Sequence, residues 1–434
     1  TNRIREHIKH WTLRLSKVFG PEVVEFARNL EESAKNLFSD GMFFEELGFR
    51  YFGPIDGHDL DKLCETFAFV KGMSGPRVIH VLTQKGKGYA FAEANQEKWH
   101  GLAAYDPATG EARKQASGPP TWTQVYGDSL VALGRERDDF VVITAAMPSG
   151  TGTSIFQKAF PGRFFDVGIA EGHAVTFAGG LATQGIRPVC AIYSTFLQRA
   201  YDNIIHDIAI QELPVVFCMD RAGLVGEDGQ THMGLYDIPY MLAVPGMTVT
   251  APRDGRELMG LLRTALDHPG PFCTRYPRDK APADPGDLGS VPAVPDGTWE
   301  TVRPGREVAI LAVGTMVDPA LEAADLLAGE GFDPVVVNCR FLKPTDDVML
   351  ESLLLTCRTL VTVEEGLVTN GFGASLAGRL QATHPGVRVV SIGIPDILHE
   401  HAPRGDQLAS FGLTGAGIAR RIAALHHEES FEPR

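Results

Sequence analysis

The stretch that most constrains the fold is residues 164–199, which contain two apolar patterns of different period. Residues 165–169 alternate between apolar and other side chains, as in a buried strand, and the small and apolar residues after Glu171 recur at helical spacing. A second apolar strand is expected over residues 187–193. A strand, a helix and a second strand in this order predict a parallel α/β sheet.

Side chains that suit a ligand site follow both of these strands. Glu171 comes where the first strand is expected to end, and Phe196 follows the second strand in a polar loop. Glu171 has an alternative role as a cap of the following helix, and an isolated phenylalanine usually belongs to a core. Because ligands bind at the carboxyl ends of parallel strands, this carboxylate and this ring predict a binding site, with Phe196 as a stacking surface.

Three arginines, Arg199, Arg221 and Arg278, each follow a predicted strand. Convergent arginines are typical of a phosphate site, since the guanidinium presents a fixed fork of donors. The alternative for each is an ion pair at the surface with one of the acidic residues, which are in excess. Asp228 and His232 lie in a Gly-rich loop that is too irregular for a pair of zinc ligands on a helix.

Charge and cysteine usage narrow the class of protein. The chain of 434 residues carries 54 acidic and 40 basic residues, and its formal net charge of -14 argues against a general nucleic-acid binder. Its six cysteines are scattered without a CxxC pair, which indicates reduced thiols in a cytoplasmic protein. No run of 18 apolar residues is present, so no membrane span is expected.

Composition divides the chain into three α/β segments. Residues 101–120 and 279–305 lose periodicity and gain glycine, proline and charged residues, so both are interpreted as linkers. We therefore expect an α/β protein of three domains with mostly parallel sheets, over residues 1–115, 116–300 and 301–434.

Local signals add detail within these segments. Residues 1–48 show helical spacing, and Asp59 is expected to cap a helix over residues 60–71. A strand is expected over residues 140–144. The basic, Gly-interrupted loop over residues 84–89 is interpreted either as a neighbour of a bound phosphate or as a solvated turn.

These segments together resemble the 1-deoxy-D-xylulose-5-phosphate synthases, a thiamine-diphosphate-dependent family of the transketolase superfamily. The resemblance covers essentially the whole chain, and the runs that carry it are FEELGFRYFGPIDGHD, TQKGKGYAFAE, FFDVGIAEGHAVTFAGGLA, AIYSTFLQRAYDNIIHD, DRAGLVGEDGQTHMG and RYPR. AIYSTFLQRAYD and DRAGLVG are specific to these synthases rather than to transketolases at large. The third segment, with VTVEEGLVTNGFG, is similar to the C-terminal domain of the superfamily.

The resemblance implies a transferase of isoprenoid and thiamine biosynthesis that uses thiamine diphosphate and Mg²⁺. It would condense pyruvate with glyceraldehyde 3-phosphate to give 1-deoxy-D-xylulose 5-phosphate and CO2. A cytoplasmic homodimer without a nucleic-acid or membrane partner is expected. The alternatives are another enzyme of the transketolase superfamily and a non-catalytic fragment that binds no cofactor.

The resemblance also implies a role for each candidate residue. The pyrimidine ring of the cofactor would be bound through its N1′ atom by Glu171 and stacked on Phe196, and Tyr89 would contact the cofactor from the first domain. The phosphate of the acceptor would be held by Tyr193, Arg199, Arg221 and Arg278. Proton transfer and the binding of substrate hydroxyls would fall to His100, Asp228 and His232.

One part of the family pattern is not found in the sequence. The Gly-Asp-Gly…Asn motif, which ligates Mg²⁺ and the diphosphate in this family, has no match in residues 1–115. The resemblance therefore implies that the N-terminal half of the first domain is missing and that this chain holds no metal ligand.

Overall fold

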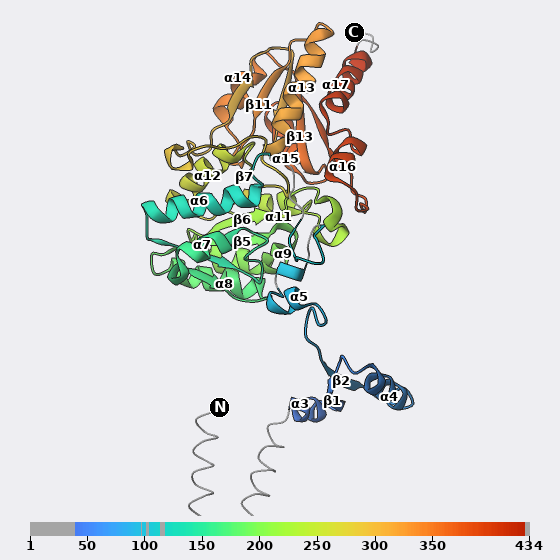
Figure 1. Ribbon diagram of the computed structural model, residues 1–434. Coiled ribbons are helices and arrows are strands. Elements are labelled where there is room, and N and C mark those ends of the chain that lie inside the picture. The colour runs from blue at the N-terminus through green and yellow to red at the C-terminus, as the bar shows by residue number, and fades with distance from the viewer. Residues whose placement is uncertain (1–39, 97, 101–103, 113–117, 430–434) are drawn as a thin grey trace, which may run out of the picture. The chain divides into compact units, whose positions relative to one another are not determined.

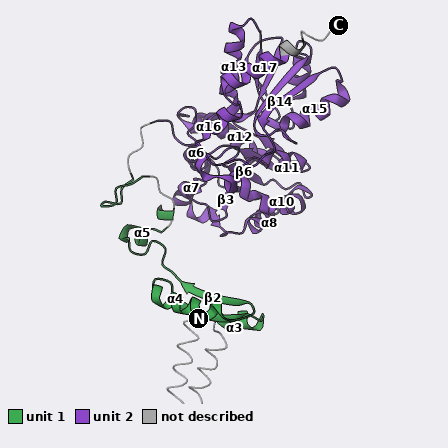
Figure 2. Cartoon of the chain, turned by 90° about the vertical axis from the view of Figure 1, so that its right-hand side faces the viewer, with its two compact units in different colours: residues 1–116 green, residues 117–434 purple. Residues whose placement is uncertain are grey.

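The computed structural model describes residues 40–96, 98–100, 104–112 and 118–429 (Figure 1). The chain forms two compact units, residues 1–116 and residues 117–434 (Figure 2). The border between the units falls inside the linker that is expected over residues 101–120. Of the helical stretch expected over residues 1–48, the part before residue 40 lies outside the described residues.

The described part of the first unit is built on a pair of parallel strands, β1 (Arg50–Asp56) and β2 (Arg77–Leu82). The helix α4 (Leu60–Lys71) connects them, and the carboxylate of Asp59 accepts a hydrogen bond from the backbone N–H of Lys62. The expected helix and its cap are therefore confirmed. The other elements are α3 (Asp40–Glu46), α5 (Ala90–Ala94) and the 3-10 turn η1 (Lys98–His100).

The second unit contains a seven-stranded sheet in the order β12-β7-β8-β6-β5-β3-β4, in which only β12 is antiparallel to its neighbour. Its strands are apolar runs, as is usual where helices cover a parallel sheet. The bounds are β3 (Phe140–Thr144), β4 (Phe164–Asp166), β5 (Arg187–Tyr193), β6 (Val216–Asp220), β7 (Thr248–Thr250), β8 (Phe272–Arg275) and β12 (Phe341–Lys343).

Helices α6, α7 and α12 pack together beside this sheet, and α8 packs against β5 (Figure 1). Thr121 begins α6 by accepting a hydrogen bond from the backbone N–H of Gln124. The bounds are α6 (Trp122–Glu136), α7 (Thr153–Ala159), α8 (Glu171–Ala182), α9 (Ser194–Leu197), α10 (Tyr201–Asn203), the π-helical turn η4 (Ile204–Ala209), α11 (Asp237–Ala243) and α12 (Gly255–Asp267).

The prediction of a buried strand over residues 165–169 is wrong. The strand β4 ends at Asp166, and the side chains of Phe165 and Ile169 are 38% and 82% exposed. The carboxylate of Asp166 accepts hydrogen bonds from the backbone N–H groups of Ala146 and Gly168, which turn the chain away from the sheet. Alternation of apolar residues alone does not distinguish a strand at a sheet edge from a turn that follows it.

A second, five-stranded sheet has the order β14-β13-β10-β11-β9 and is parallel except for β9. The edge strand β9 lies within the linker expected over residues 279–305, so part of that linker is regular structure. The bounds are β9 (Glu300–Arg303), β10 (Val308–Ala312), β11 (Val335–Asn338), β13 (Thr359–Leu367) and β14 (Arg388–Ile394).

Helices α13 and α17 lie side by side, and α15 packs against β13 and β14 (Figure 1). The side chain of Thr414 caps α17 through the backbone N–H of Gly417. The bounds are α13 (Val317–Gly329), α14 (Asp347–Leu354), α15 (Phe372–Thr383), α16 (Arg404–Ser410) and α17 (Gly415–Glu429). The α/β class with mostly parallel sheets is confirmed.

The two sheets of the second unit are joined through the strand β12 and through Trp299. β12 comes after β11 in sequence, yet it pairs with β7 of the seven-stranded sheet. The indole N–H of Trp299 donates to the carbonyl of Phe341 on β12, and both side chains are buried. Buried apolar residues from both sheets therefore share one hydrophobic core cluster.

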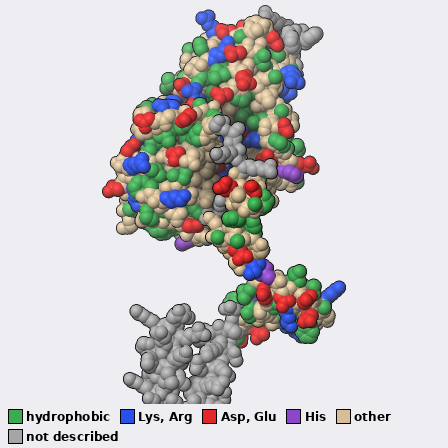
Figure 3. Space-filling view, in the orientation of Figure 1, with side chains coloured by type: hydrophobic (Ala, Val, Ile, Leu, Met, Phe, Trp, Pro, Cys, Tyr) green, Lys and Arg blue, Asp and Glu red, His purple; other side chains and the backbone are tan. Residues whose placement is uncertain are grey.

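The charged side chains and the cysteines show no unusual grouping among the described residues. Acidic and basic side chains are intermingled on the face drawn in Figure 3. All six cysteines are free thiols, and only Cys64 among them is exposed. Within the described ranges, no helix combines the length and the apolar composition that a membrane span requires.

Candidate functional site

The site is built on the adjacent strands β5 and β6, which are paired in register at Tyr193 and Asp220. Because these strands are parallel, the residues that follow them come to the same edge of the sheet. Phe196 and Arg199 follow β5, and Arg221 follows β6. The sheet therefore brings together the predicted aromatic ring and two of the three predicted arginines.

Glu171 is the first residue of α8, and its side chain is only 4% exposed. The guanidinium Nη1 of Arg199 donates to its Oε1 atom, so the carboxylate pairs with a cation and not with the helix backbone. The Oε2 atom of Glu171 has no hydrogen-bond partner among the described residues. Glu171 thus has one carboxylate oxygen that remains to accept a hydrogen bond from a ligand.

Phe196 lies in α9, directly after β5, and its ring is half-buried. The ring of Tyr193 is stacked on it with centroids 5.5 Å apart, and the ring of His232 meets it edge-on at 5.2 Å. The guanidinium carbon of Arg199 lies 4.7 Å from its centroid. Phe196 is therefore an aromatic platform beside the buried carboxylate of Glu171.

Arg221 follows the last residue of β6 and has a φ of 62°, which is unusual for a residue with a side chain. Its guanidinium lies 3.7 Å from the ring centroid of Tyr193, and its Nη1 atom donates to the carbonyl of Gly150 at 2.8 Å. It also pairs with the carboxylates of Asp220 and Asp228, each at 3.4 Å. These contacts fix the guanidinium and offset the cost of the backbone conformation.

Arg278 lies on the other side of Asp228. Its Nη1 atom is 3.3 Å from Asp228 Oδ1, 3.4 Å from the carbonyl of Val225 and 3.7 Å from Glu227 Oε2. Asp228 therefore joins Arg221 and Arg278, since each guanidinium contacts one of its two carboxylate oxygens. The predicted residues of the second unit form one continuous set of contacts from Glu171 to Arg278.

Burial changes the acid–base properties of two groups in this set. Burial raises the pKa of Asp220 to about 6, although the guanidinium of Arg221 and the hydroxyl of Thr123 oppose the shift. Burial likewise raises the pKa of Tyr193 to about 12, so its phenol keeps the proton at neutral pH and can donate it in a hydrogen bond. Sequence reasoning missed Asp220, and the available signal was an acid at the end of an apolar strand next to Arg221.

Tyr89 and His100 belong to the first unit. The hydroxyl of Tyr89 donates to the carbonyl of Pro107 at 2.9 Å, and its ring meets that of Trp99 edge-on at 4.9 Å. His100 is exposed at the end of η1. In the loop over residues 84–89, the N–H of Gly88 donates to the carboxylate of Glu93.

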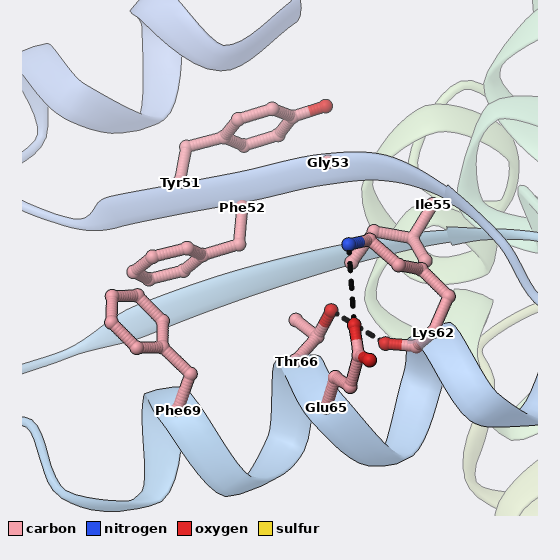
Figure 4. A pocket seen from close by; sticks show the side chains of 8 residues that line it. All are labelled: Tyr51, Phe52, Gly53, Ile55, Lys62, Glu65, Thr66 and Phe69. Carbon is pink, nitrogen blue, oxygen red and sulfur yellow. Dashed lines mark hydrogen bonds and ion pairs between the residues drawn. The ribbon is translucent and has the colours of Figure 1, made fainter.

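The first unit also has a hollow of about 480 Å³ between β1 and α4 (Figure 4). Lys62 and Glu65 form an ion pair of 3.4 Å at its wall. The remaining lining is mostly apolar or aromatic and comprises Tyr51, Phe52, Gly53, Ile55, Thr66 and Phe69. None of the predicted site residues lines this hollow.

The site residues of the second unit suit the pyrimidine ring of thiamine diphosphate. An acceptor for a ring N–H and a flat apolar surface are the groups that such a ring requires, and Glu171 and Phe196 supply them. The described ranges contain no group of three or more His, Cys, Asp or Glu side chains that could hold a metal ion.

Comparison with known proteins assigns both sheets of the second unit. The transketolase pyrimidine-binding domain matches residues 118–283, and the transketolase C-terminal domain matches residues 297–418. A solved split-gene transketolase, described as an inactive β4 tetramer, is 32% identical with a TM-score of 0.63. The match covers 71% of this chain and 98% of that one. The fold and these matches thus define a protein of the transketolase class.

More specific matches identify the family within this class. The family model of 1-deoxy-D-xylulose-5-phosphate synthase matches residues 1–83. Synthases of that name from Geobacter sulfurreducens and Pelotomaculum thermopropionicum are 48% and 47% identical over 407 and 422 residues. The chain belongs to the 1-deoxy-D-xylulose-5-phosphate synthase family. The matches cover 94% and 97% of this chain but only 64% and 66% of those relatives.

Proposed function

We propose that this chain acts as a 1-deoxy-D-xylulose-5-phosphate synthase, a thiamine-diphosphate-dependent transferase. Its substrates would be pyruvate and glyceraldehyde 3-phosphate, and its products 1-deoxy-D-xylulose 5-phosphate and CO2. The main support is the continuous set of contacts that leads from the buried carboxylate of Glu171 to the arginines on either side of Asp228. One end of this set suits a pyrimidine ring and the other suits a phosphate.

At the cofactor end, Glu171 would accept a hydrogen bond from the N1′ side of the pyrimidine ring, which would lie against Phe196. When bound, thiamine diphosphate supplies the carbon nucleophile and the electron sink for decarboxylation. The part of the protein is to hold the ring and to keep a carboxylate against N1′. Arg199 would keep the Glu171 side chain in place through its bond to Oε1. Tyr89 would contact the cofactor from the first unit.

At the acceptor end, Arg221 and Arg278 would bind the phosphate of glyceraldehyde 3-phosphate, and the phenol of Tyr193 would donate to it. Both arginines already contact Asp228, so a phosphate dianion would have to take over donors from that carboxylate. His232, whose ring contacts Phe196, would transfer a proton during the condensation. His100 and Asp228 would bind substrate hydroxyls.

Other features that are expected from the sequence and from the resemblance stay part of the proposal. These are the requirement for Mg²⁺, assembly as a homodimer, location in the cytoplasm, and the three domains over residues 1–115, 116–300 and 301–434.

The test is a product assay with thiamine diphosphate and Mg²⁺, followed by NMR. We expect ¹³C-labelled pyruvate and glyceraldehyde 3-phosphate to give 1-deoxy-D-xylulose 5-phosphate and CO2 in equal amounts. Faster ketol transfer from a ketose phosphate than from pyruvate would favour another transketolase-type activity. Absence of product from either donor would contradict the proposal and favour a non-catalytic chain.

A further inference from the structure

We propose that Glu365 is a positioning residue. From its place on the C-terminal sheet, it fixes the loop that carries Asp228 and His232. This inference rests on the proposed function for its kinetic readout. The loop, residues 223–232, belongs in sequence to the pyrimidine-binding segment. Glu365 lies on β13 of the other sheet, within the segment that matches the C-terminal domain.

The carboxylate of Glu365 is only 2% exposed and has hydrogen-bond partners at both oxygens. Its Oε1 atom accepts from the backbone N–H of Leu224 at 2.9 Å and from Arg404 Nε at 3.1 Å. Its Oε2 atom accepts from Thr315 Oγ1 at 3.2 Å and from Arg404 Nη2. Because a buried charge is costly unless it is paired, this arrangement strongly favours one placement of the Leu224 backbone.

The loop approaches Glu365 closely because it begins with a glycine. Gly223 has a φ of 79°, and a Cβ atom at this position would lie 2.6 Å from Glu365 Cδ. Two residues beyond Leu224, the backbone N–H of Gly226 donates to Oε1 of the buried Gln407 at 3.1 Å. The C-terminal sheet and α16 thus bind the backbone at both ends of the segment 224–226.

Apolar packing supports the same attachment. Leu224 and Val225 are fully buried in the hydrophobic cluster that contains Ile310 of β10 and Val361 of β13. Met233 and Leu235, which follow the loop, are buried in the same cluster. The loop is therefore anchored in the core of the C-terminal sheet, while Asp228 and His232 extend to the candidate site.

Arg404 links this anchor to the second arginine of the acceptor end. Its Nη1 atom pairs with the carboxylate of Asp279 at 2.6 Å, and Asp279 is the residue next to Arg278. Arg278 in turn pairs with Asp228 and contacts the carbonyl of Val225. Glu365 and Arg404 therefore act on the acceptor end through the backbone, without contacting the site themselves.

The test compares Glu365→Gln with the control Thr315→Val in the whole protein. Glu365→Gln would place an amide NH2 group where the donors of Leu224 and Arg404 now point. Thr315→Val removes one hydrogen bond to the same carboxylate and leaves the bonds from Leu224 and Arg404 in place. Amide hydrogen exchange in peptides over residues 222–235 should become at least about tenfold faster in Glu365→Gln and stay unchanged in the control. Peptides that cover β5 should exchange as in the unchanged protein.

Steady-state kinetics separates positioning from general destabilisation. We expect the KM for glyceraldehyde 3-phosphate to rise at least about tenfold in Glu365→Gln, with the KM for pyruvate within about twofold of the unchanged protein. Because His232 also lies in the loop, kcat is expected to fall as well. A KM for glyceraldehyde 3-phosphate within about twofold of the unchanged protein would overturn the inference, whatever the change in kcat. Unchanged exchange over residues 222–235 would overturn it as well.

A second variant covers the case in which Glu365→Gln does not fold. Gln407→Leu removes the bond to the Gly226 backbone and leaves Glu365 in place, and it should speed exchange over residues 222–235 in the same direction. If exchange responds as expected but the unchanged protein forms no 1-deoxy-D-xylulose 5-phosphate, the anchor stands and the proposed function fails. If neither variant alters exchange, the anchor fails whatever the activity.

Discussion

At the scale of single residues, Asp228 joins the two arginines of the proposed acceptor end, because its carboxylate pairs with both Arg221 and Arg278. The sequence placed these three residues near one another, since each follows a strand or lies in the loop after one. It did not show that Asp228 lies between the two arginines, or that Arg199 pairs with Glu171. Such pairings depend on side-chain packing between segments that are far apart in sequence.

Arg278→Ala tests the role of the second arginine. Loss of a charge-assisted hydrogen bond to phosphate should raise the KM for glyceraldehyde 3-phosphate by about tenfold and leave the KM for pyruvate unchanged. Arg379→Ala is the matched control, since Arg379 is similarly exposed and pairs with Asp347 on α14. Equal effects of the two variants on the acceptor KM, measured by steady-state kinetics, would count against a phosphate site at Arg278.

At the scale of elements, the helix and strand signals that rest on local chemistry were the most reliable. The cap at Asp59, the bounds of α4 and the strand β3 agree with the sequence analysis. The expectation for residues 165–169 failed, because the backbone N–H of Gly168 bonds to the side chain of Asp166 and not to a neighbouring strand. A period of two is also satisfied by a short strand followed by a turn.

The start of α15 gives a prediction for pH dependence. The buried carboxylate of Glu364 accepts hydrogen bonds from the backbone N–H groups of Phe372 and Gly373. Burial raises its pKa to about 7, and the nearby Asp237 adds to the shift, while those two bonds and Arg275 oppose it. Because the folded protein binds this proton more tightly than the unfolded chain does, Glu364 contributes stability at low pH that is lost as pH rises through 7.

Glu364→Gln should remove this pH dependence, because the amide mimics the protonated acid. We compare the two proteins by the free energy of unfolding of the variant minus that of the unchanged protein. This difference should rise by on the order of 3 kcal/mol between about pH 4 and pH 8. Urea unfolding at several pH values measures this difference. A difference between the two proteins that is constant with pH would show that Glu364 does not titrate in this range.

At the scale of the whole molecule, the second unit joins two sheets that the sequence analysis separates by a linker. The linker at residues 279–305 was recognisable from its composition, but the pairing of β12 with β7 was not. The anchor at Glu365 was likewise missed, and its only signal was the pair of acidic residues in the apolar run of β13. Contacts between sheets depend on tertiary packing that no local pattern encodes.

The most direct test of the account is a calorimetric titration of this chain with thiamine diphosphate in the presence of Mg²⁺. We expect saturable binding, which Glu171→Ala weakens at least about tenfold because the ring loses a charge-assisted hydrogen bond in a buried site. Glu351→Ala, a change at an exposed glutamate of α14, should bind as the unchanged chain does. Equal affinity in the Glu171 variant and the unchanged chain would contradict the account, and so would absence of binding by the unchanged chain.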